Sequence, residues 1–156
     1  MLKIKHIFTM NDMVNLSEDG KTVISALDHL TRHITIPQGV EVIGNWALCS
    51  LDYLTSVVFL DDVIEIGDYA FAGDFSLLNF DIPNSVIKIG SNVFMDCQSL
   101  ECIHIHITDF EKLNISEYAF NGVNMDECIL YVPMGMKQAY SNHPVFGKFK
   151  NIEIER

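Results

Sequence analysis

Three stretches of the chain repeat one pattern: ITIPQGVEVIG (residues 34–44), VVFLDDVIEIG (57–67) and FDIPNSVIKIG (80–90). Each stretch begins 23 residues after the one before it. A constant period in this range is typical of solenoids, in which each repeat forms one coil and stacks on its neighbours. The sequence therefore predicts a short right-handed stack of coils.

Each repeat holds two groups of apolar residues. In the first group apolar residues alternate with others, which is the period of a strand with one buried face. Because every coil turns the same way, these strands should pair in parallel as one continuous sheet. The second group, such as Val40 and Ile43, should pack the opposite wall. We expect strands near residues 34–36, 57–59, 80–82, 103–105 and 130–132.

The ends of the chain depart from the repeat, as the ends of a solenoid must if its interior and sheet edges are to be covered. Residues 16–24 indicate a hairpin around Asp19-Gly20. Residues 136–140 suggest a helix and residues 151–154 a closing strand. We expect one domain over residues 1–156, with an N-terminal cap (1–33), repeats (34–132) and a C-terminal cap (133–156).

Composition narrows the function classes. Of 156 residues, 10 are basic and 21 acidic, and the net charge of -11 disfavours nucleic acid and anionic lipid as partners. No apolar run approaches the ~18 residues that a spanning helix needs, so we expect no membrane insertion. Residues 1–12 carry basic side chains, but polar residues interrupt them before a secretory core forms, so no export signal is expected.

The repeat also carries a recurrent sequence motif. A strand and Pro are followed by Val-x-x-Ile-Gly, Ala-Phe and Cys-x-Ser-Leu, best preserved in FMDCQSL (residues 94–100). Over residues 16–154 the chain resembles the BspA-type leucine-rich repeat family, although Asp74 and Leu51 stand at the consensus cysteine position, Leu48 replaces the Phe and Ser116 the Gly. The resemblance implies an α/β leucine-rich repeat solenoid with few, short helices. It also implies a surface or secreted protein that binds host or bacterial proteins, as adhesins of that family do.

Candidate chemistry is sparse. The spacing of Cys49, Cys97, Cys102 and Cys128 does not suggest zinc, and we expect buried free thiols. His104 and His106 should share a strand face near Asp81 or Asp109, yet a metal site needs a further ligand and a second shell. Cys102 with His104 is the only thiol–imidazole pair that the repeat brings close. We therefore expect no cofactor, no metal and no enzymatic activity, and we find no evident small-molecule substrate.

These observations favour a noncatalytic protein interaction module; the alternative is a structural scaffold with no ligand of its own. A partner should dock on the outward side of the sheet, with Tyr131 as its anchor because Tyr is enriched at binding hot spots. Residues 107–114 are the next candidate. Steps of 23 residues, with a longer last coil, give two outward rows: Thr35, Val58, Asp81, His104 and Tyr131, and His33, Ser56, Asn79, Cys102 and Ile129.

Overall fold

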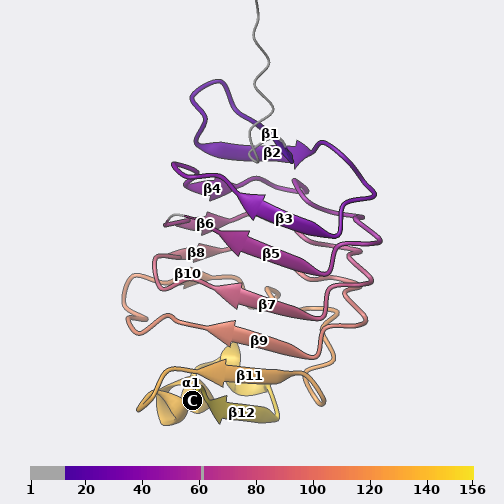
Figure 1. The fold of residues 1–156 in the computed structure, drawn as a ribbon. Helices are drawn as coiled ribbons and strands as arrows, with labels where there is room; N and C mark the ends of the chain where they lie inside the picture. The colour runs from indigo at the N-terminus through magenta and orange to yellow at the C-terminus, as the bar shows by residue number, and fades with distance from the viewer. Residues whose placement is uncertain (1–12, 61) are drawn as a thin grey trace, which may run out of the picture.

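The structure, a computed structural model, describes residues 13–60 and 62–156. The chain winds downward in Figure 1 as a stack of coils: long strands run leftward in front, and the chain returns behind them. The coils are therefore right-handed, as the sequence predicts. Residues 1–12 lie outside the described residues, and the prediction that they hold no export signal concerns this segment.

The front wall consists of four-residue parallel strands, one from each coil. Each begins one residue before the range that the repeat predicts. A final strand, β12 (Asn151–Ile154), pairs with β11 in parallel and ends the wall. The coil strands are β3 (His33–Ile36), β5 (Ser56–Phe59), β7 (Asn79–Ile82), β9 (Cys102–Ile105) and β11 (Ile129–Val132).

The rear wall is a second sheet, ordered β1-β2-β4-β6-β8-β10. Here β1 (Val14–Leu16) and β2 (Thr22–Ala26) form the antiparallel hairpin that Asp19-Gly20 predicts, and the remaining strands pair in parallel. Those strands have two residues each: β4 (Val42–Ile43), β6 (Glu65–Ile66), β8 (Lys88–Ile89) and β10 (Asn114–Ile115).

The expectation of one continuous sheet needs correction. Hydrogen bonding divides the front wall into β3-β5 and β12-β11-β9-β7, and the rear wall is a sheet of its own. The division in front coincides with the aromatic Phe59, where β3 and β7 carry Ile36 and Ile82. The Phe59 ring meets Phe80 edge to face at 5.8 Å. Both rings are accommodated between β5 and β7, where the front sheet divides.

Aromatic rings fill the middle of the stack. Phe71, Phe94 and Phe120 recur at one position of successive coils and are buried. Their rings stack with centroids 5.9 and 6.1 Å apart. In the first coil Leu48 takes this place and is equally buried. Buried aromatic rings are among the largest apolar contributions to a protein core.

Close approach of neighbouring coils explains two of the recurrent glycines. A Cβ on Gly67 would lie 2.7 Å from the backbone nitrogen of Asn45, and one on Gly90 would lie 2.7 Å from that of Asp68. Real Cβ atoms do not approach backbone so closely. The glycine at this position therefore allows each coil to contact the one before it.

Among the described residues, Asp74 is the one polar or charged residue buried in this core. Asp74 is fully buried at the position that Leu51 and Cys97 occupy in adjacent coils. Its Oδ1 accepts the Leu51 N–H at 2.8 Å, whereas Oδ2 has no partner within residues 13–60 and 62–156. Burial raises the pKa of this carboxyl from 3.8 to about 8, against the opposing effect of the Leu51 hydrogen bond.

The C-terminal end is closed by α1 (Lys137–Asn142), a 3-10 turn η1 (Phe146–Lys148) and β12. The helix begins one residue later than expected and extends two residues further. The buried Tyr140 hydroxyl donates to the Ile107 carbonyl at 2.6 Å, which ties the helix to the preceding coil. Among the described residues, no helix has the length and apolar character needed to cross a membrane.

Candidate functional site

The outward side of the front wall brings the two predicted rows together. In the first row Thr35 pairs with Val58, and His104 lies between Asp81 and Tyr131. In the second row His33 pairs with Ser56, and Cys102 lies between Asn79 and Ile129. Strand β12 lengthens the rows with Glu153 and Asn151. Sequence reasoning thus located the rows, while their binding role stays a prediction.

The N-terminal half of this face is open and weakly polar. Val58 exposes 52% of its surface, and Leu60, just beyond β5, exposes 56%. The His33 Nδ1 and Ser56 Oγ atoms are 2.7 Å apart, which joins β3 to β5 through side chains. Thr35 and Ser56 are half-buried, whereas His33 and Asn79 are exposed.

The C-terminal half is more ordered by side-chain contacts. The His104 ring stacks on Tyr131, with centroids 4.7 Å apart and planes 16° from parallel. Both rings are half-buried. A hollow of about 460 Å³ lies beside them, lined also by residues 153–156. The predicted anchor Tyr131 therefore has one face covered by an imidazole.

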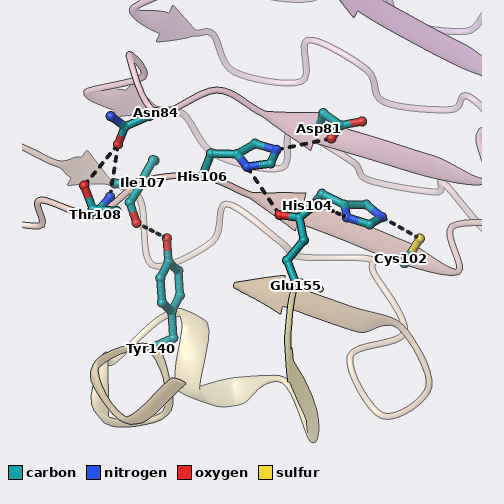
Figure 2. A network of polar contacts seen from close by, with 9 residues as sticks. All are labelled: Asp81, Asn84, Cys102, His104, His106, Ile107, Thr108, Tyr140 and Glu155. Carbon is teal, nitrogen blue, oxygen red and sulfur yellow. Dashed lines mark hydrogen bonds and ion pairs between the residues drawn. The ribbon is translucent and has the colours of Figure 1, made fainter. Parts of the chain in front are cut away.

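Glu155 joins the two histidines of this half (Figure 2). Its Oε1 lies 3.1 Å from His104 Nδ1, and its Oε2 lies 3.4 Å from His106 Nδ1. His106 Nε2 also contacts Asp81 Oδ1 at 3.3 Å. Of the two carboxylates considered from sequence, Asp81 is the one beside the imidazoles. Asp109 instead accepts the Glu111 N–H at 2.9 Å.

Sequence reasoning missed Glu155 because it follows the closing strand and has no equivalent in the repeat. Only the register of β12 against β11 brings it next to residues about fifty positions earlier. Across residues 13–60 and 62–156, no group of three or more His, Cys, Asp or Glu side chains is arranged to hold a metal ion. That the protein needs no metal or cofactor stays a prediction.

The thiols differ in exposure. All four are free, but only Cys97 and Cys128 are buried, and Cys49 and Cys102 are half-buried. This corrects the expectation that all four are buried. On the front face the Cys102 Sγ lies 3.6 Å from His104 Nε2, the one thiol–imidazole pair that the repeat suggested.

The segment 107–114, our second candidate surface, serves largely to hold the C-terminal end. Besides the bond from Tyr140 to Ile107, Thr108 donates its backbone N–H to Asn84 Oδ1 at 3.1 Å. The Phe110 ring packs on Tyr140 at 4.8 Å and on His143 at 5.0 Å. Because these contacts occupy segment 107–114, the front wall is the better candidate surface for binding a partner.

Comparisons with known proteins agree with this architecture. The stacked right-handed coils with parallel strands define a leucine-rich repeat type of solenoid. Residues 28–142 match the model of the BspA type leucine rich repeat region, in six copies. The chain belongs to the BspA-type leucine-rich repeat family.

A solved structure shares the fold. The crystal structure of the pneumococcal vaccine antigen PcpA matches with a TM-score of 0.54 and 15% sequence identity, over 93% of this chain and 47% of that one. The chain thus spans about half the length of that antigen. No curated protein matches the sequence at a significant level.

Proposed function

We propose that the chain is a noncatalytic protein interaction module whose partner docks on the outward face of the front wall. The observation that carries the proposal is the register of the outward residues along parallel strands, within β3–β5 and within β7–β9–β11. Side chains on a sheet already lie in fixed positions before a partner binds. Little conformational entropy is therefore lost when a partner docks on them. Repeat proteins commonly bind through extended surfaces of this kind.

Tyr131 is the proposed anchor, with Val58 and Asp81 contributing along the same row. Stacking on His104 holds the Tyr131 ring, so that little rotamer freedom remains to be lost on binding. Val58 supplies exposed apolar area, and the exposed Asp81 supplies charge. Such a mixture of an aromatic, apolar residues and rim charges is typical of protein interfaces.

The finer part of the proposal is an adhesin-type role, in which the partner is a host or bacterial protein met at a cell surface. Its support is the family to which the chain belongs. The net charge of -11 favours partners with a basic surface, because long-range attraction speeds their encounter.

The test uses the triple variant Val58→Ala, Asp81→Ala and Tyr131→Ala. Proteins retained by the immobilised wild type from host-matrix and bacterial-surface panels are identified, and their Kd is measured by titration. The triple variant should weaken binding by at least about tenfold, since hot-spot truncations cost about 2 kcal/mol or more. Unfolding by urea should show nearly unchanged stability.

A matched control lies away from the front wall. Ile87→Ala, Glu117→Ala and Tyr118→Ala together remove the same kinds of side chain, and all three residues are exposed. This control should bind as the wild type does. Equal Kd values for the wild type and the front-wall variant would exclude this face. A wild type that retains no protein from the panels would favour the scaffold alternative.

A further inference from the structure

A thiol, an imidazole and a carboxylate lie in a line on the front wall (Figure 2). Cys102 and His104 are two residues apart on β9, so their side chains leave the same face of the strand. Cys102 Sγ lies 3.6 Å from His104 Nε2, and His104 Nδ1 lies 3.1 Å from Glu155 Oε1. Nucleophile, base and orienting group are thus in contact in the order that thiol activation requires.

The contacts assign the protons of this line. An ionised Glu155 can only accept, so His104 Nδ1 donates to it. A neutral His104 then has its lone pair on Nε2, facing the Cys102 S–H. Three neighbours hold the array in place: Tyr131 stacks on the His104 ring, and Glu155 is itself fixed by His106, which in turn contacts Asp81.

The thiol depends on this base. Burial raises the pKa of Cys102, and the charges of Glu101 and Asp81 raise it further. The resting group is therefore a protonated thiol, which is a poor nucleophile without a base to take its proton. The other half-buried thiol, Cys49, has no imidazole contact within the described residues.

We propose that Cys102 is a nucleophilic thiol that undergoes exchange with small disulfides, with His104 as its general base and Glu155 as a positioning residue. As Sγ attacks one sulfur of the disulfide, its proton passes to His104 Nε2. A new S–S bond forms and the disulfide bond breaks. The leaving thiolate takes the proton from His104, so that one mixed disulfide and one free thiol result.

This site goes beyond the proposed binding role, which needs no covalent step. The reaction is stoichiometric and modifies the protein. The Cys102 thiol is half-buried, so a small disulfide can reach it from solvent. The hollow of about 460 Å³ lies on the Glu155 side of the His104 ring, and Cys102 is not among its lining residues. The surrounding carboxylates of Asp81, Glu101 and Glu155 favour neutral or cationic disulfides over anionic ones.

The test measures how fast each cysteine of the intact protein reacts with dithiodipyridine, a neutral aromatic disulfide. Release of thiopyridone gives the rate by absorbance, and peptide mass spectrometry of early samples assigns it to a residue. Cys102 should react first, at least about tenfold faster than Cys49, since a positioned general base contributes a factor of that size or more. Cys49 serves as an internal control that needs no variant.

Two variants test the role of the base. In His104→Gln the rate at Cys102 should fall to that of Cys49 or below, because the raised pKa of the thiol remains while its base is gone. His33→Gln removes an imidazole that contacts Ser56 on the same face, and it should leave the Cys102 rate unchanged. Circular dichroism confirms that both variants fold.

Glu155→Gln tests positioning. The Cys102 rate should fall without a change at Cys49, and nitrogen NMR of the His104 imidazole should show loss of the single tautomer with a proton on Nδ1. A purely structural Glu155 would leave that tautomer in place. The proposal is overturned if Cys102 of the wild type reacts no faster than Cys49, or if His104→Gln leaves its rate unchanged.

Discussion

Inward and outward positions of the same front strands differ sharply in chemistry. The inward row is apolar and buried throughout: Ile34, Val57, Phe80, Ile103 and Leu130. The outward row changes from Thr35 to Val58, Asp81, His104 and Tyr131, with no shared property. Inward residues must fill the space between coils at crystal-like density, whereas outward ones meet solvent or a partner. Positions that vary within a regular repeat therefore indicate which residues are available for binding or chemistry specific to this protein.

The largest effect should come from disrupting the column of stacked rings formed by Phe71, Phe94 and Phe120. Phe94 is fully buried, stacked between Phe71 and Phe120 and in edge contact with Phe80 at 4.9 Å. Phe94→Ala should cost about 3–5 kcal/mol of unfolding free energy, because transfer and cavity terms add. Urea unfolding measures it, with the exposed Phe75→Ala as a control that should change stability little. A loss below ~1 kcal/mol would mean that the ring is not in the core.

Asp74 is an exception among the buried residues, since its side chain is an ionisable carboxyl. Because its folded pKa of about 8 exceeds the usual 3.8, the folded state binds the proton more tightly. Its contribution to stability is fully present below about pH 4 and is lost as the pH rises to about 8.

Asp74→Asn should remove this dependence. As the pH rises from about 4 to about 8, the thermal midpoint of Asp74→Asn should increase relative to that of the wild type. The control is Asp52→Asn, a substitution at an exposed neighbour, which should not show this trend. A difference between wild type and Asp74→Asn that is constant with pH would show that the carboxyl stays ionised in the core.

A smaller effect concerns the buried hydroxyl of Tyr140. Tyr140→Phe keeps the ring but leaves the Ile107 carbonyl without its donor, which should cost about 1–3 kcal/mol. Urea unfolding gives the value. The control is Tyr118→Phe, since Tyr118 is 57% exposed and water replaces its contacts. Equal stability of Tyr140→Phe and wild type would show that water reaches that carbonyl.

The smallest effect should come from the outward row. Val58→Ala removes an exposed side chain and should change stability by no more than about 0.5 kcal/mol, whereas its inward neighbour Val57→Ala should cost clearly more. The pair tests the assignment of faces within a single strand by urea unfolding. Similar losses for both would place the two side chains in similar surroundings.

Sequence alone located the repeat because burial recurs at every 23 residues, and inward residues such as Phe71 and Phe94 carry that signal without ambiguity. It also placed the hairpin and both outward rows. It missed the interruption of the front sheet at Phe59, since backbone hydrogen bonding depends on small shifts between coils. Glu155 could not be foreseen, because its contact with His104 joins the closing segment to a coil and no periodicity relates them.

The side-chain bonds between coils have a consequence for the order of unfolding. Asn45 Oδ1 accepts the Asp68 N–H, and Asp68 Oδ1 accepts the Ser91 N–H, so each bond joins residues 23 apart in adjacent coils. A stack held by nearest neighbours melts inward from its weaker end. The bond from Tyr140 to Ile107 and the buried rings of the C-terminal segment strengthen that end. Amide protons should therefore exchange first in the β1–β2 hairpin and more slowly in each coil further from it, as a gradient along the solenoid.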